Sequence, residues 1–126
     1  MKKELEDKLF ELGKDIIRPD PDLQQNLMVF GFECGDGWYE LLYKLISDIL
    51  ATEPSEDFEL FQAKEKYGEL RVYTNCSTDE IENLIRVAED TSITICEMCG
   101  AKAKTQKVRG WYHTICDKCL KEIKKR

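Results

Sequence analysis

Four cysteines near the C-terminal end are the strongest structural constraint in this sequence of 126 residues. Cys96 and Cys99 stand in CEMCG, and Cys116 and Cys119 stand in CDKC after an interval of 16 residues. The pattern C-x2-C-x16-C-x2-C lies within the range of structural zinc sites, in which two intervening residues let both thiolates of a pair reach one ion. Because four thiolates close a tetrahedral coordination sphere, we expect one structural zinc ion.

The short segment that carries these cysteines is expected to need the metal in order to fold. Residues 93–126 number only 34 and hold few large apolar side chains, and chains below about 40 residues seldom fold without a metal or disulfides. KTQKVRGWYHT predicts a β-hairpin around Arg109 and Gly110, and the second cysteine pair then begins a final helix. This order of knuckle, hairpin and helix resembles a treble-clef finger. A zinc ribbon is the alternative, which the helical pattern after Cys116 disfavours.

Two further cysteines and the only histidine stand outside this pattern. His113 precedes Cys116 by three residues, but four cysteines already complete the site, so we expect an exposed or packed imidazole. Cys34 and Cys76 have no C-x-x-C partner, and small buried side chains are the simplest interpretation of both.

The rest of the chain predicts an α+β fold. The expected elements are a helix over residues 5–16, a strand over 28–32, a helix over 37–51, a β-hairpin of FELFQAKE and ELRVYTN, and a helix over 78–91. Helices should cover one face of a small antiparallel sheet, because consecutive elements of this kind bury their apolar faces against each other. We therefore expect a body of residues 1–92 followed by a treble-clef-like zinc finger of residues 93–126.

Capping residues suggest where these helices begin and end. The first helix should stop before Pro19 in an RPDPD turn, since proline disfavours helical geometry in the residue before it. Asp36 is the expected N-cap of the second helix, and Ser77 with Glu80 forms a capping box for the third.

Charge is divided unevenly along the chain. Residues 1–95 hold 10 Lys and Arg against 22 Asp and Glu, a net charge of −12, whereas residues 96–126 hold nine against three, a net charge of +6. An acidic body repels a polyanion, which makes nucleic acid a less favoured partner for the whole chain. The tail KEIKKR could contact phosphate, although its cations also lie where they stabilise the C-terminal end of a helix.

The sequence contains no apolar run of the roughly 18 residues that a membrane span requires, and its start lacks a signal-peptide pattern. We therefore expect a cytoplasmic protein with no membrane partner. In a reducing cytosol, paired C-x-x-C units indicate metal binding rather than a disulfide framework.

The expected hairpin carries a candidate ligand site. A turn at Tyr67-Gly68 pairs Lys64 with Arg71, Gln62 with Tyr73, and Ala63 with Val72. One face then collects Phe61, Ala63, Leu70 and Val72, and the other presents Gln62, Lys64, Arg71 and Tyr73. Two facing cations repel unless an anion lies between them, and a neighbouring carboxylate is the simpler solution. The functional alternative is that Lys64 and Arg71 clamp a phosphate while Tyr73 or Trp38 stacks on a base.

The turn GDGW at residues 35–38 is a second candidate. Its glycines allow close backbone approach at a helix N-terminus, which favours an anion, although a simple strand-to-helix connection explains it as well.

Three separated motifs support a family resemblance. FGFECGDGW before a Leu-rich helix, QAKEKYGELRVYTN, and CEMCG with WYHTICDKC resemble a family of small phage and prophage proteins of largely unassigned function. The resemblance runs from Met28 to Cys119. Typical members have Phe where Tyr67 stands and a second aromatic where Val72 stands, changes that leave the hairpin intact. It implies a gene carried by a bacterial virus and, by analogy only, a counter-defence factor in the host bacterial cytosol.

These features bear on three classes of function. A treble-clef nuclease needs a histidine base and further His or Asn ligands around an open metal, which one histidine cannot provide, so we expect no enzyme. A nucleic-acid adaptor acting through the basic finger is the alternative, because Trp111 and Tyr112 stand among Lys107, Arg109 and Lys118. The favoured hypothesis is a non-catalytic protein that binds a small anionic nucleotide or a host defence protein.

Overall fold

The computed structural model describes residues 1–19 and 26–125. Much of the predicted RPDPD turn, and Arg126 of the tail, lie outside these residues. The elements are α1 (Lys3–Leu12), a 3-10 turn η1 (Met28–Phe30), β1 (Phe32–Glu33), a 3-10 turn η2 (Asp36–Trp38), α2 (Tyr39–Ala51), β2 (Leu60–Lys66), β3 (Glu69–Thr74), α3 (Asp79–Ser92), β4 (Lys104–Val108), β5 (Trp111–Ile115) and α4 (Asp117–Lys124).

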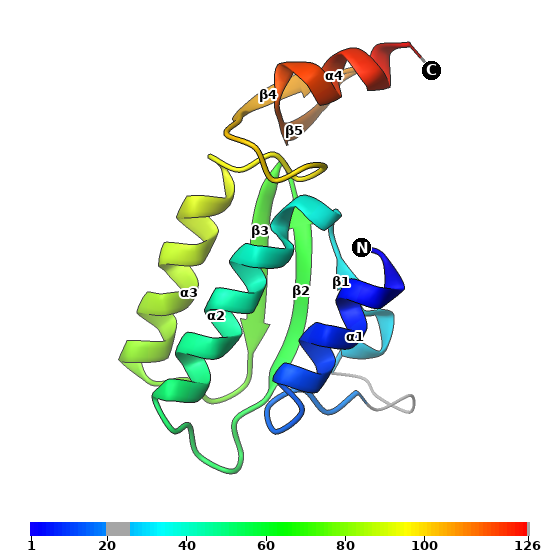
Figure 1. Ribbon diagram of the computed structural model, residues 1–126. Coiled ribbons are helices and arrows are strands. Elements are labelled where there is room, and N and C mark those ends of the chain that lie inside the picture. Colours follow the sequence, from blue (N-terminus) through cyan, green and yellow to red (C-terminus); the bar gives the residue numbers. More distant parts are fainter. Residues whose placement is uncertain (20–25, 126) are drawn as a thin grey trace.

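The predicted α+β fold is confirmed. In Figure 1 the helices α1, α2 and α3 lie side by side in front of the sheet β1-β2-β3, and the unit of β4, β5 and α4 lies at one end of it. Strands β2 and β3 are antiparallel, as expected. Strand β1 joins the other edge of β2 in parallel, pairing Phe32 with Ala63 and Glu33 with Lys64. Among the described residues, no helix is both long and apolar enough to cross a lipid bilayer.

The strand predicted over residues 28–32 is mostly a 3-10 turn. The Asn26 side chain accepts a hydrogen bond from the Met28 amide at 2.8 Å, which holds the chain in a turn where a strand would need extended geometry. Gly31 follows with a φ of 75°, and only Phe32 and Glu33 then pair with β2. Side-chain capping therefore overrides the β propensity of MVFGF.

The register of the central hairpin is the one predicted from polarity. Lys64 pairs with Arg71, Gln62 with Tyr73, and Ala63 with Val72. Tyr67 and Gly68 form the two-residue loop, with φ angles of 55° and 84°, as a type I′ turn requires. One predicted position is wrong: an irregularity between Leu60 and Gln62 shifts the pairing, so Leu60 is buried in the place expected for Phe61.

Two helix ends differ from the predicted ones. Helix α1 stops at Leu12, because the amides of Ile16 and Ile17 both bond to the Gly13 carbonyl and turn the chain. Ile16 is buried as expected, but it follows the helix. The cap of α3 is Thr78, whose hydroxyl accepts a hydrogen bond from the Ile81 amide, while Ser77 contacts Glu82 instead.

The free edge of β3 is satisfied by side chains of α3. The Ser92 hydroxyl accepts a hydrogen bond from the Leu70 amide at 3.0 Å, and the Glu89 carboxylate accepts one from the Val72 amide at the same distance. These contacts give partners to two donors that an edge strand otherwise leaves open. Burial raises the pKa of Glu89, and its hydrogen bond from Val72 opposes that change.

The described residues form two separate apolar clusters. The larger one contains the inner faces of α1, α2, α3 and the sheet, and Ile95 packs against it. The smaller one contains Cys96, Val108 and Ile115. The proposed division into residues 1–92 and 93–126 stays a prediction, and Ile95, on the finger side of it, packs against the larger cluster.

Replacing Ser92 with Ala should lower the free energy of unfolding by about 1–3 kcal/mol, because the buried Leu70 amide would be left without its side-chain acceptor. Chemical denaturation would measure the change. Ser77→Ala, which removes a solvent-exposed hydrogen bond, is the control and should cost less than about 0.5 kcal/mol. Equal stability of the two variants would contradict the edge-capping role of Ser92.

Candidate metal centre

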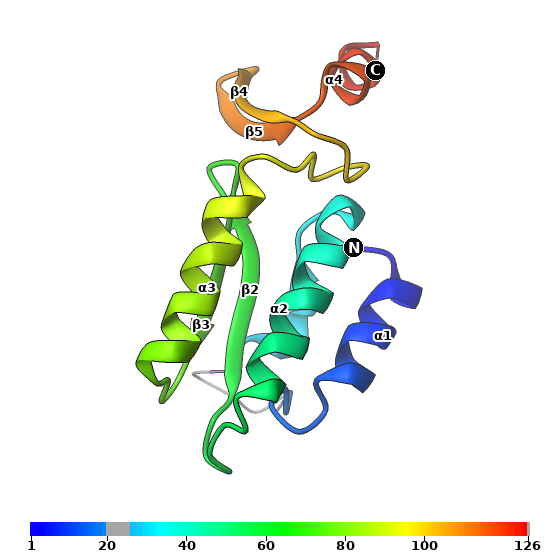
Figure 2. The same ribbon diagram turned by 60° about the vertical axis from the view of Figure 1, so that its left-hand side comes forward.

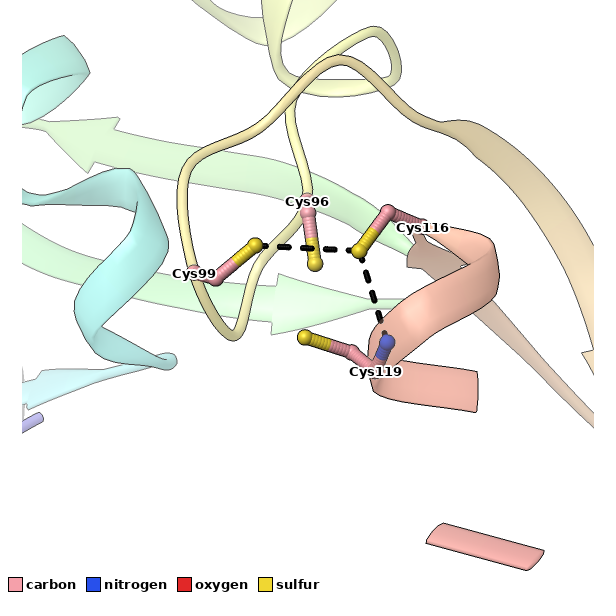
Figure 3. Close-up of side chains that lie close together, drawn as sticks. All are labelled: Cys96, Cys99, Cys116 and Cys119. Carbon is pink, nitrogen blue, oxygen red and sulfur yellow. Dashed lines mark hydrogen bonds between the residues drawn. The ribbon is translucent and has the colours of Figure 1, made fainter. Parts of the chain in front are cut away.

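The first cysteine pair lies on a tight knuckle that follows α3. The Gly100 amide donates to the Cys96 carbonyl at 2.9 Å, and the Cys96 amide donates to the Ala101 carbonyl at 2.7 Å. Gly100 adopts a φ of 83°, a left-handed geometry that favours glycine. The knuckle therefore turns the backbone so that Cys96 and Cys99 point to the same side, as Figure 3 shows.

The second pair lies at the start of α4. Cys116 is the N-cap of this helix, and its sulfur accepts a hydrogen bond from the Cys119 amide at 3.4 Å. Strands β4 and β5 connect the knuckle to the helix, and they pair from Lys104–Ile115 to Val108–Trp111 around a turn at Arg109 and Gly110. The order knuckle, hairpin, helix is that of a treble clef, and the position of Cys119 within α4 excludes the second knuckle of a zinc ribbon.

The four sulfurs fit one tetrahedral zinc ion. All four lie within 4.8 Å of one another, and the Sγ atoms of Cys99 and Cys116 are 3.7 Å apart. Zinc–sulfur bonds of about 2.3 Å place the sulfurs of a tetrahedral site about 3.8 Å apart. That separation is far beyond a disulfide bond of about 2.05 Å. The cluster therefore has the composition and geometry of a structural zinc site.

The thiols of the cluster differ in acidity. The hydrogen bond from the Cys119 amide lowers the pKa of Cys116 to about 7, whereas desolvation and then its thiol neighbours raise the pKa of Cys119. Zinc binding requires thiolates, so the ion must displace the protons that such thiols retain at neutral pH. Zinc affinity should therefore fall as the pH falls.

The knuckle rests on the GDGW turn of the body. The Gly37 amide donates to the Glu97 carbonyl at 2.7 Å, and the Gly35 amide donates to the Glu97 carboxylate at 2.9 Å. A Cβ atom on Gly37 would overlap the Cys96 carbonyl and lie 2.6 Å from the Gly100 nitrogen. Both glycines are thus needed for close backbone approach. The anion expected at this turn is the protein's own Glu97 carboxylate.

Burial and hydrogen bonding shift the pKa of Glu97 in opposite directions. Burial raises the pKa of its carboxyl group, and the hydrogen bond from Gly35 partly offsets that change.

Asp36, the expected N-cap of α2, instead lies in η2 and accepts a hydrogen bond from the Lys2 amide at 2.7 Å.

The tip of the β2–β3 hairpin makes the second contact with the finger. The Thr114 hydroxyl donates to the Gly68 carbonyl at 2.6 Å and also contacts the Thr105 hydroxyl at 2.7 Å. Gly68 and Thr114 are both buried. A Cβ atom on Gly68 would approach the His113 backbone to 3.3 Å, so this glycine serves both the turn and the contact.

The predicted ligand residues are only partly brought together. Lys64, Arg71 and Tyr73 share the face of the sheet that is turned away from the helices, as predicted. Trp38 is fully buried, and its ring nitrogen donates to the Ile95 carbonyl at 2.9 Å. Its predicted stacking role is therefore wrong, because its ring anchors the finger linker within the core.

The predictions for the cysteines and the histidine outside the cluster differ in outcome. Cys34 is buried, as expected, and burial raises the pKa of its thiol to about 12. Cys76 is exposed, so its predicted burial is wrong; it follows β3, outside the apolar cluster. His113 is half-buried on β5 and is not among the clustered ligands of the described residues.

Glu97 and Thr114 are structural residues of the site that the sequence did not reveal. Their partners, Gly35 and Gly68, lie 62 and 46 positions away, so no local pattern links them. The glycines in GDGW and YG were the available signal, since each allows another backbone to approach closely.

Comparison with protein-family models, with curated proteins and with solved structures finds no match to this chain.

The purified protein should contain one zinc ion per chain by metal analysis. Cys99→Ser should lose the metal and unfold the finger while leaving most of the helical circular dichroism, because α1, α2 and α3 belong to the other apolar cluster. Cys76→Ser removes an exposed cysteine outside the cluster and should keep one zinc. Absence of zinc in protein prepared without chelator would contradict the site.

Gly37→Ala should destabilise the protein by about 1–3 kcal/mol, because the added methyl group overlaps the backbone of the knuckle. Zinc content should stay at one ion, since no ligand changes. Gly110→Asn is the control: nothing lies within 4 Å of its Cβ position, and asparagine takes a left-handed φ more readily than most residues, so only backbone strain at the φ of 87° separates it from the wild type. Unchanged unfolding of Gly37→Ala would show that the knuckle does not depend on this turn.

Proposed function

We propose that the protein is a non-catalytic, zinc-stabilised nucleic-acid-binding protein whose main contact surface is the β4–β5 hairpin. The observation that carries this proposal is two exposed aromatic rings, one on each face of a basic hairpin. Trp111 and Tyr112 are 66% and 49% exposed, and the Nζ atom of Lys107 lies 5.9 Å from the centre of the Tyr112 ring. Aromatic rings interleaved with cations form stacking and phosphate contacts in proteins that bind single strands.

The lysines of the finger have few acidic partners. Within residues 96–125, Lys125 lies 3.8 Å from Glu122, and no other lysine of the finger lies within ion-pair distance of a described carboxylate. Glu97 is engaged by the body, and Asp117 lies in the first turn of α4. The positive charge of these lysines is therefore available to a polyanion.

The acidic body does not oppose this interaction as strongly as its net charge suggests. Helices α1, α2 and α3 carry 11 acidic against four basic side chains. Figure 2 shows the β4–β5 hairpin and α4 beyond one end of these helices. Screening over about 10 Å at 0.1 M salt weakens repulsion between such separated charges.

Zinc would supply no chemistry to this function. Four cysteine ligands leave no position for water or substrate, so the ion would only fix the hairpin against the knuckle and α4.

A small anionic nucleotide on the sheet face is a second candidate. Its support is the Nε atom of Arg71, which is buried and has no hydrogen-bond partner among the described residues. Against it, Glu69 lies 3.5 Å from the Arg71 guanidinium, and Glu33 is the neighbour of Lys64 across β1 and β2, with its carboxylate on Gln62. These carboxylates are the simpler solution for the two facing cations, and the burial of Trp38 removes one stacking ring. A counter-defence role, or a host protein partner, stays a prediction.

Fluorescence anisotropy with labelled single-stranded and duplex oligonucleotides tests the proposal. The wild type should bind at low salt and weaken as salt rises. The double variant Lys104→Gln/Lys107→Gln should reduce the slope of log affinity against log salt, by about 0.7 for each single-strand phosphate that the variant no longer neutralises. Trp111→Ala should weaken single-strand binding by about 1–3 kcal/mol.

The double variant Lys3→Gln/Lys8→Gln is the matched control, because it removes the same charge from α1. It should bind as the wild type does. Absence of binding at low salt, or an equal weakening in the finger and helix variants, would contradict the proposal.

A further inference from the structure

Three lysine–tyrosine pairs share one geometry. The Nζ atoms of Lys64 and Lys66 each lie 5.8 Å from the ring centres of Tyr73 and Tyr67, respectively, and Lys107 lies 5.9 Å from that of Tyr112. All three rings are exposed, by 43%, 63% and 49% in the same order. Each pair therefore offers a flat ring and a cation side by side.

The first two pairs follow one strand. Side chains alternate between the faces of a strand, so Lys64 and Lys66 point to the same side, about 7 Å apart along β2. Ala63, Leu70 and Val72 fill the opposite face with core contacts. Tyr73 lies across from Gln62 on the lysine side, and Tyr67 forms the turn next to Lys66. The pairs thus run along the open sheet face to the hairpin tip.

The third pair continues this path on the finger. Thr105 and Thr114 pair across β4 and β5, and they contact Gly68 at the hairpin tip. Lys107 and Tyr112 are the next pair on the same face of that hairpin, because each lies two residues from a threonine. Figure 2 shows β4 and β5 above the end of β2 and β3, with α4 on their other side.

The backbone of Tyr67 supports a role for its side chain. A bulky residue with a φ of 55° is uncommon, and asparagine is favoured at this position of a type I′ turn. The ring is largely exposed, so packing does not explain its presence. Strain retained at an exposed aromatic indicates a functional constraint.

We propose that a single strand of nucleic acid lies along this path, with its bases on Tyr73, Tyr67 and Tyr112 and its phosphates on Lys64, Lys66 and Lys107. The proposal rests on the proposed function and names its ligand. Single strands fit because their bases are free to stack on protein rings, whereas bases inside a duplex are stacked on each other. Arg71 lies beside Lys64, but the Glu69 carboxylate lies 3.5 Å from its guanidinium, so Arg71 is not counted among the phosphate contacts.

Oligothymidine and oligouridine of about 12 nucleotides, within the usual site sizes of single-strand binders, are the probes. Tyr67→Asn should weaken their binding about fivefold or more in anisotropy titrations, while the thermal midpoint stays equal or rises because Asn-Gly suits the turn. Tyr73→Thr should weaken it similarly. Neither change should alter duplex binding.

Tyr43→Gln is the matched control. Tyr43 lies on α2 with 42% exposure, nearly that of Tyr73, but it belongs to the helical layer. Its variant should bind both oligonucleotides as the wild type does.

Three outcomes would overturn the path. Unchanged binding of Tyr67→Asn and Tyr73→Thr, with weaker binding of Trp111→Ala, would confine the contact to the finger and leave the proposed function standing. Thymidine monophosphate binding as tightly as the oligomer, with binding abolished in Arg71→Ala, would favour a small-nucleotide site. Failure of the wild type to bind any nucleic acid would overturn the proposed function as well.

Discussion

The contact between the zinc knuckle and the Gly35-Asp36-Gly37 turn connects the metal cluster to the rest of the fold. The knuckle presents its backbone to the turn, and Glu97 accepts hydrogen bonds from both glycine amides through its carbonyl and carboxylate. The next residue, Trp38, is fully buried and bonds to Ile95 just before the first ligand. The cysteines therefore close the finger and also fix the start of α2. A substitution in the knuckle or in the turn should therefore affect both the finger and the start of α2.

Much of this architecture follows from local sequence. The four zinc ligands were predictable because the C-x2-C spacing itself brings two thiolates to one ion. The hairpin register was predictable because only one register separates Ala63 and Val72 from Lys64 and Arg71. In both cases the physical signal lies within a few residues of the feature that it specifies. Fold class then followed from the order of the elements.

The predictions were wrong where a residue's partner is distant in the sequence and takes the place of the expected local partner. Asp36 is of a residue type that commonly caps helices, yet its carboxylate accepts a hydrogen bond from the backbone amide of Lys2. The GDGW turn does receive an anion, but the anion is Glu97, 62 positions from Gly35. Trp38 ends that turn and begins the apolar pattern of α2, and the core encloses its ring, which leaves no face free for stacking. A glycine indicates that something approaches closely, and only the fold identifies what approaches.

The same contacts bear on how zinc could affect binding without touching a ligand. Tyr112 follows Tyr67 along one surface only while Thr114 rests on Gly68 and the knuckle rests on GDGW. Removal of the metal would release Cys116 from the knuckle and free the β4–β5 hairpin to move relative to the sheet. Aligning separated contacts in advance lowers the entropy cost when a flexible strand binds. The ion would therefore raise the affinity of the proposed strand path through geometry, by keeping Tyr112 aligned with Tyr67 and Lys66.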